Sequence, residues 1–345
     1  MLKENRKYFA AANTYNGFVS YFSDIFKPDE YERIYVIKGG PGTGKSSLMR
    51  NIVSCFNDKA EEIQEIYCSS DPNSLDGIII KNKGKKVAII DGTAPHEKDT
   101  VYPGVIDEII YLGENWDSRF LLGQKETILS INKGKAEAYR TAYSYLSQAG
   151  KAAEFIKDVH YTKFNKLKAK NKAEELFSSI NCSGKGKITP RLLSSFGKYG
   201  NYNLTFKSDK LISLSNNTFC SNIILNCFSE YLISKGYSFY RFLHVLSPSD
   251  TDAIFIKEAK TIITKNDIPD IASEEYFNLT PYDFERMKCA YTIHDMALEE
   301  AKRWFNIASD LHFRLEELYS SAMDFTKNND ILLKKSEEIR TILDL

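Results

Sequence analysis

The sequence predicts an α/β protein built from two related halves, each a three-layer arrangement of helices around a sheet. Three observations support this prediction. Short apolar runs alternate with longer amphipathic segments, as in open sheets covered by helices. One apolar run leads through a glycine-rich turn straight into a helical segment. The same order of elements recurs after a polar linker at 181–187, and 345 residues are enough for two domains.

Charge and hydropathy exclude some classes of protein. The 46 basic and 46 acidic side chains cancel, so no overall field attracts nucleic acid or an anionic membrane. No apolar run approaches the roughly 20 residues that span a bilayer, and the N-terminal stretch lacks a signal peptide's apolar core. We therefore expect a cytoplasmic protein that binds neither membrane nor nucleic acid. Its expected partners are a nucleotide and either another protein or further copies of the chain.

The glycine-rich turn is Gly39-x-x-x-x-Gly44-Lys45-Ser46, between an expected strand at 34–37 and an expected helix at 46–56. Such a pattern is typical of a phosphate-binding loop, in which backbone amides surround phosphate oxygens. Lys45 would reach the β- and γ-phosphates, and the Ser46 hydroxyl would ligate Mg²⁺. A tight turn without a ligand is the structural alternative. The residues expected at the phosphates are Gly39, Gly40, Pro41, Gly42, Thr43, Gly44, Lys45, Ser46 and Ser47.

A second strand at 65–68 is expected to end in a turn that contains Asp71. Ligands of open α/β sheets lie beyond the carboxyl ends of the strands. Asp71 would then face the γ-phosphate region or a second substrate. Alternatively, it only opens the turn before Pro72.

Two further strands are expected at 77–80 and 87–92, and the second of them places Asp91 at the end of an apolar run. An acid in this position can hold Mg²⁺ or its water shell beside Ser46. Gly92 follows where many ATPases have a water-activating glutamate. His96 is therefore a candidate general base, with a purely structural histidine as the alternative.

Residues 117–180 contain no proline and carry apolar residues at helical spacing. The pattern predicts two antiparallel helices packed as a hairpin. Lysines are frequent at 133–172, which indicates a solvated helix face more than a nucleic-acid surface. Together with the linker, these segments predict one domain at 1–182, with a helical extension at about 117–180, and a second domain at 188–345.

The second half follows the order of the first, ending in a charged helical extension at about 281–345. Residues 35–80 align with 211–256 at a constant shift, although few pairs are identical. The segment 215–222, which corresponds to the phosphate loop, has no glycine and no lysine, and Lys265 stands in the place of Asp91. We therefore expect a degenerate second copy that binds no phosphate in this way. The alternative is an unrelated α/β domain with a helical tail.

Three blocks of sequence resemble a family of bacterial tandem P-loop proteins described as ATPases or ATP-binding proteins, within the P-loop NTPase superfamily. They are GGPGTGKS at 39–46, CSSDPNSLDG at 68–77 and AIIDGTAPH at 88–96. The resemblance implies two P-loop units over most of the chain. The degenerate segment 215–222 departs from it and puts a two-site mechanism in doubt.

The sequence as a whole predicts a Mg·ATP-binding P-loop protein with slow or partner-stimulated ATPase activity. Lys45, Asp91 and His96 are the expected catalytic residues, Ser46 and Asp91 the metal ligands. A small-molecule or nucleotide kinase and a nucleotide-gated interaction protein are the alternatives. ATP is favoured over GTP because no guanine-recognition motif of the form N/T-K-x-D is evident.

Overall fold

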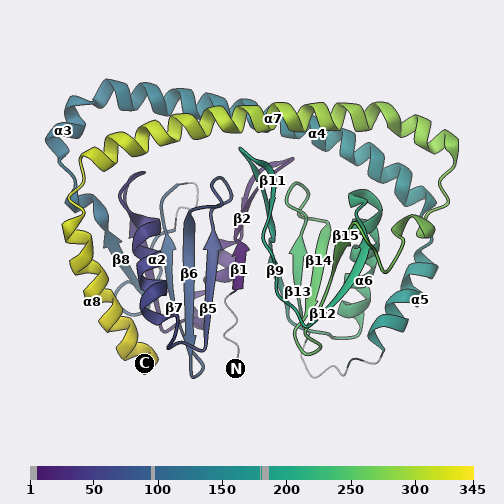
Figure 1. Ribbon diagram of the computed structural model, residues 1–345, viewed down its shortest axis with the longest axis horizontal. Coiled ribbons are helices and arrows are strands. Elements are labelled where there is room, and N and C mark those ends of the chain that lie inside the picture. The colour runs from purple at the N-terminus through teal and green to yellow at the C-terminus, as the bar shows by residue number, and fades with distance from the viewer. Residues whose placement is uncertain (1–5, 95–97, 179, 181–185) are drawn as a thin grey trace.

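The computed structural model describes residues 6–94, 98–178, 180 and 186–345. It confirms a mixed α/β protein with two mixed sheets, one of six strands and one of five. The sheets stand side by side beneath two long helices (Figure 1). Two short hairpins lie between the sheets and reach towards these helices.

The first sheet has the strand order β1-β5-β6-β7-β4-β8. All neighbours are parallel except at β6, which runs antiparallel to both β5 and β7. The carboxyl ends of the other five strands therefore meet at one edge. The strands are β1 Arg6–Phe9, β4 Arg33–Lys38, β5 Glu62–Tyr67, β6 Leu75–Asn82, β7 Lys85–Asp91 and β8 Asp107–Tyr111.

The second sheet repeats this topology in the order β9-β13-β14-β15-β12, and again only one strand, β14, is antiparallel to its neighbours. A parallel bridge between Leu214 and Ile271 takes the place of β8. The strands are β9 Ile188–Arg191, β12 Lys210–Ser215, β13 Phe239–Leu243, β14 Thr251–Ile256 and β15 Thr261–Asn266. The hairpins are β2 Ala11–Thr14 with β3 Gly17–Ser20, and β10 Ser194–Gly197 with β11 Gly200–Asn203.

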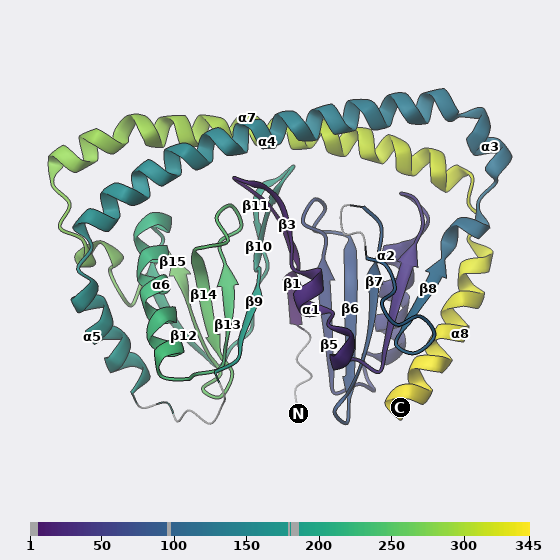
Figure 2. The same cartoon turned by 180° about the vertical axis from the view of Figure 1, so that it is seen from behind.

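The faces of both sheets are covered unequally. In the first half, α2 (Lys45–Phe56) and α8 (Thr326–Leu343) share the apolar cluster of one face, while the four-residue α1 (Phe22–Ile25) covers the other (Figure 2). In the second half, α5 (Lys166–Phe177) and α6 (Thr218–Ser234) pack on one face. On its other face, Phe206 packs on the sheet residues Phe242 and Phe255. The expected third helical layer is thus reduced to α1.

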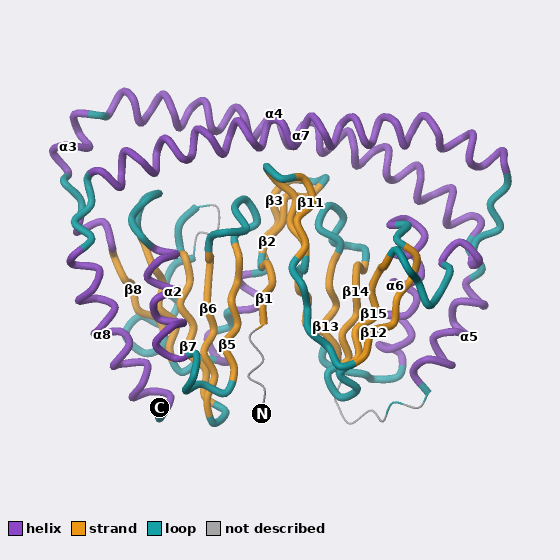
Figure 3. The backbone as a smooth tube through the Cα atoms, in the orientation of Figure 1, coloured by secondary structure: helices purple, strands orange, loops and turns teal. Residues whose placement is uncertain are grey.

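The predicted helical hairpin at 117–180 is wrong. The segment forms α3 (Ser118–Gly123), one continuous helix α4 (Lys125–Lys163) and α5. Instead of folding back on itself, α4 packs antiparallel along α7 (Pro281–Ser321), and both pass over the two sheets (Figure 3). Contacts run from Gly134 beside Leu311 to the ion pair of Lys163 with Asp283 at 3.1 Å. Helical spacing showed which face is buried but not which helix covers it.

The long helices exchange partners between the halves. Helix α4 extends from the first half to the second, where it is followed by α5, and α5 packs on α6 of the second half. Helix α7 runs the opposite way and leads to α8, which packs on α2 and β7 of the first half (Figure 1). The Asn82 amide donates to the Leu343 carbonyl at 2.8 Å, and Ile339 is fully buried in the first half's core. The first sheet is therefore completed by the end of the chain.

Three short 3-10 helices complete the described elements: Pro28–Glu30, Leu112–Asn115 and Ser273–Tyr276. None of the helices that the structure describes is long and apolar enough to cross a membrane.

Because α8 packs on the first half, we predict that a substitution of a buried residue in α8 destabilises that half. Ile339→Asp places an unpaired charge in the first half's core and should lower the free energy of unfolding by at least about 3 kcal/mol. The matched control is Leu333→Asp on the same helix, because Leu333 is 70% exposed. Denaturant unfolding measures both variants. Equal stability of the two would show that α8 does not hold the first sheet.

Candidate functional site

The connection between β4 and α2 contains two glycines in the left-handed region of backbone conformation. Gly42 and Gly44 adopt φ values of +70° and +85°, which only glycine reaches without strain. Gly44 directly precedes α2, so the amides of the first helical turn have no acceptor within the helix. The positive end of the α2 dipole therefore lies at this loop.

The Lys45 side chain folds back over the loop. Its ammonium donates to the carbonyls of Gly39 at 3.2 Å and Gly40 at 2.8 Å. It also lies 3.6 Å from a carboxylate oxygen of Asp91. The buried Thr43 hydroxyl donates to the Gly40 carbonyl at 2.9 Å and closes the turn. The lysine charge thus lies at the loop.

Asp91 is brought to the loop by the sheet. It is the last residue of β7 and pairs with Ile37 on the neighbouring β4. Its Oδ1 accepts hydrogen bonds from the backbone amide and the hydroxyl of Thr93, at 2.9 and 2.6 Å, while Oδ2 faces Lys45. One oxygen of Asp91 therefore caps the turn at Thr93, and the other forms the ion pair with Lys45. Burial raises the pKa of Asp91 although Lys45 and Thr93 oppose the shift.

Ser46 and Ser47 occupy the first turn of α2. The Ser46 hydroxyl accepts the Leu75 amide at 2.9 Å, which ties the helix to the start of β6, and Ser47 is exposed. The described residues contain no group of three or more His, Cys, Asp or Glu side chains able to hold a metal. Ser46 and Asp91 suit Mg²⁺ nonetheless, because this ion commonly takes one or two protein ligands and completes its shell with phosphate oxygens and water.

Asp71 lies at the carboxyl end of β5, but its carboxylate already has partners. One oxygen is 3.8 Å from the Lys198 ammonium and accepts the Asn73 amide at 3.2 Å. Lys198 belongs to the β10–β11 connection, so this ion pair joins the two halves. Arg191 also contacts the first half, where it lies 3.8 Å from the Tyr8 ring. Both contacts are on the β1–β5 side of the sheet, whereas the glycine loop follows β4.

The α7–α8 corner, residues 316–328, covers the glycine loop. The Ser320 hydroxyl donates to the Gly42 carbonyl at 3.0 Å, and the Asn328 amide donates to the Thr43 carbonyl at 3.1 Å. A side chain at Gly42 would collide with the Glu316 carbonyl. Backbone hydrogen bonds between residues 115–117 and 322–324 hold the corner in place. Sequence analysis missed these contacts, since no local pattern marks polar helix residues that meet a loop far away in the chain.

His96, the candidate base, lies outside the described residues. Gly92 itself leaves no room for a longer residue, because a Cβ there would collide with Val36. A glutamate directly after Asp91 is thus incompatible with this packing.

In the second half, the β12–α6 connection takes the place of the glycine loop, and Lys265 takes the place of Asp91. The charge of Lys265 is neutralised by an acid of the same chain. Only Asn216 and Asn217 separate β12 from α6, and Asn217 caps the helix by accepting the Cys220 amide at 3.2 Å. Lys265 forms an ion pair with Asp252 and donates to Asn222 at 3.3 Å. Burial alone would raise the pKa of Asp252, but Lys265, His244 and Asn222 together outweigh it, so the pKa is lowered. This lysine therefore has its countercharge in the protein itself.

No family model, curated protein or solved structure matches this chain.

The raised pKa of Asp91 predicts a pH-dependent difference between parent and Asp91→Asn. A carboxyl whose pKa is higher in the folded than in the unfolded protein favours folding while it is protonated. That contribution is lost as the pH rises through the folded-state pKa. Relative to Asp91→Asn, the parent should therefore lose stability from about pH 4, the ordinary carboxyl pKa, upwards. Denaturant unfolding at several pH values measures this. A constant difference between the two proteins would contradict the shift.

Proposed function

We propose that the chain is a P-loop protein that binds Mg·ATP and hydrolyses it slowly or when stimulated by a partner. One observation carries the proposal. At the carboxyl edge of two adjacent parallel strands, a loop with left-handed Gly42 and Gly44 holds Lys45 3.6 Å from Asp91. A purely structural turn needs neither a partly buried acid nor a lysine that faces it.

The residues have distinct roles in this proposal. The amides of residue 40 and residues 42–46, together with the α2 dipole, bind the β-phosphate, and Lys45 exchanges its bonds to the Gly39 and Gly40 carbonyls for phosphate oxygens. Ser46 and Asp91 hold the magnesium ion. The ion would neutralise charge that develops on the phosphates. Asp91 must be ionised for this purpose, and Lys45 favours that form.

Slow turnover follows from what surrounds Asp91. Packing against Val36 excludes a glutamate at position 92, the place where many ATPases carry the residue that activates the attacking water. The kinase alternative relied on Asp71 as a docking point for an acceptor. Its carboxylate is instead 3.8 Å from the Lys198 ammonium. Hydrolysis is therefore the reaction we favour.

Nucleotide-gated interaction is a second candidate function, because the α7–α8 corner contacts the loop directly. Ser320 and Asn328 hydrogen-bond to the carbonyls of Gly42 and Thr43. A nucleotide that reorganises these carbonyls would alter the corner. The long helix α7 then connects the corner with the second half.

Lys45→Ala tests the site itself. The substitution removes the cation that contacts phosphate and should weaken Mg·ATP binding at least about tenfold, as expected for a lost charged hydrogen bond. Lys59→Ala, at an exposed lysine just after α2, is the matched control. Calorimetric titration and phosphate release measure binding and turnover. Equal affinity for Mg·ATP in parent and Lys45→Ala would refute the proposal.

Hydrogen–deuterium exchange tests the second candidate. Adding Mg·ATP to the parent should change the exchange rates of amides at residues 316–328, since the corner contacts the loop that closes on phosphate. The same addition to Lys45→Ala should change nothing. An unchanged corner in a parent protein saturated with Mg·ATP would exclude gating through α7–α8.

A further inference from the structure

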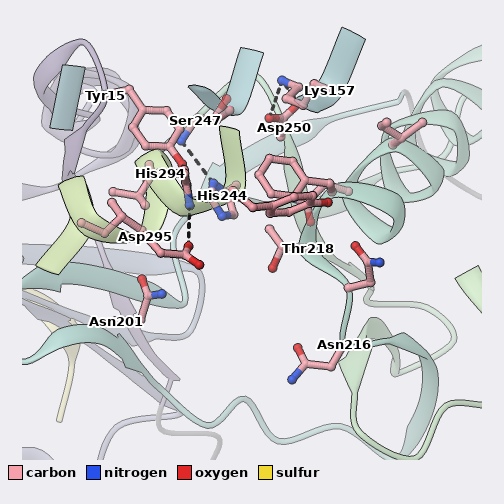
Figure 4. A pocket seen from close by; sticks show the side chains of 18 of the residues that line it. Tyr15, Lys157, Asn201, Asn216, Thr218, His244, Ser247, Asp250, His294 and Asp295 are labelled. Carbon is pink, nitrogen blue, oxygen red and sulfur yellow. Dashed lines mark hydrogen bonds and ion pairs between the residues drawn. The ribbon is translucent and has the colours of Figure 1, made fainter. Parts of the chain in front are cut away.

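A cavity of about 550 Å³ lies in the second half, in the position that corresponds to the glycine loop of the first. It is bounded by the β12–α6 connection, by residues after β13, and by α4 and α7 (Figure 4). Tyr15 reaches it from the first half, where its hydroxyl lies 2.8 Å from Nε2 of His294. The volume is within the range of small-molecule sites, about 300–1,000 Å³.

The charged groups of the cavity are paired with one another. Lys157 on α4 contacts both carboxylate oxygens of Asp250, at 3.0 and 2.7 Å. His294 lies 2.9 Å from Asp295. Among the lining residues, Lys157 is the only lysine or arginine. A polyphosphate would therefore meet no unpaired cation here, and it would also face two carboxylates.

Aromatic rings form part of the wall. Phe219 at the start of α6 packs edge-on against Tyr291 of α7, with ring centroids 5.6 Å apart. Phe284, one to two turns earlier on α7, also lines the cavity, although its side chain is 57% exposed. An exposed aromatic ring at the rim of a cavity offers a flat surface on which a planar ligand can stack.

The remaining polar groups are uncharged. In the described part of the chain, the side chains of Asn201 and Thr218 have no hydrogen-bond partner. Nδ1 of His244 accepts the Ser247 amide at 3.2 Å, which leaves the proton of a neutral ring on Nε2. Burial lowers the pKa of His244 and favours that neutral form. The cavity thus combines amide, hydroxyl and imidazole groups with aromatic walls.

We propose that this cavity binds a small uncharged molecule with a flat heteroaromatic ring that both donates and accepts hydrogen bonds, the chemistry of a nucleoside. Asparagine amides match the paired donor and acceptor edges of nucleobases, and aromatic rings stack on their faces. The paired charges disfavour nucleotides, so the phosphate-free form is the expected ligand. The site is separate from the glycine loop and does not depend on the function proposed for it.

Calorimetric titration with adenosine, guanosine, cytidine and uridine tests the proposal on the full chain. At least one of the four should bind at a single saturable site. Phe284→Ala should weaken that binding about tenfold through loss of stacking, and Thr218→Val, of nearly equal shape, should weaken it about fivefold through loss of the hydroxyl. The matched control is Tyr282→Ala, because Tyr282 is 73% exposed on the same helix and does not line the cavity.

Lys45→Ala separates this site from the glycine loop and should bind the nucleoside as the parent does. Three results would overturn the proposal. The first is no saturable binding of any of the four nucleosides at millimolar concentration. The second is equal affinity in the parent, Phe284→Ala and Thr218→Val. The third is tighter binding of AMP than of adenosine to Lys45→Ala, which would reveal an anion site.

Discussion

The antiparallel packing of α4 on α7 is the contact on which the rest of the structure depends. Each helix begins over one sheet and ends over the other, so each half is completed by a helix that the other half contributes. Small residues on both helices, among them Ala142, Ala149, Ala301 and Ala308, are fully buried. Larger side chains there would separate the helices. Both candidate sites lie beneath this pair, between the helices and the carboxyl edges of the sheets.

The two halves use one topology with opposite electrostatics. In the first half, the lysine stands on the helix and the acid at the end of the strand next to β4, as Lys45 and Asp91. In the second, the strand next to β12 carries Lys265, and the acid is Asp252 on the antiparallel strand β14. The first arrangement leaves a cation at a glycine loop, where in the proposed function phosphate would replace the carbonyl oxygens of Gly39 and Gly40. The second arrangement has no cation free for such an exchange, and the open space beside it is lined by paired charges and uncharged polar groups.

Local sequence patterns predicted the elements that depend on local forces. The strand before Gly39, the helix after Gly44 and the position of Asp91 at the end of a strand follow from apolar runs and glycine conformations. The pairing of long helices did not follow, because an amphipathic stripe such as that of α4 shows a buried face without its partner. The contact of Ser320 with the loop was equally inaccessible, since exposed and buried serines look alike in a helix. The cavity of the second half was not predicted. The absence of glycines at 215–222 indicates that phosphate does not bind there, but it does not indicate that a cavity is present.

The exchange of helices also has a consequence for synthesis. Asn82 in the first sheet bonds to the carbonyl of Leu343, and these residues are 261 positions apart. At translation rates of about 5 to 20 residues per second, the ribosome needs on the order of 10 to 50 seconds to make the intervening chain. During that time the face that α8 will cover has no partner from its own half. A chaperone that binds apolar surface could occupy it, so the nascent first half is the form of this protein most exposed to aggregation.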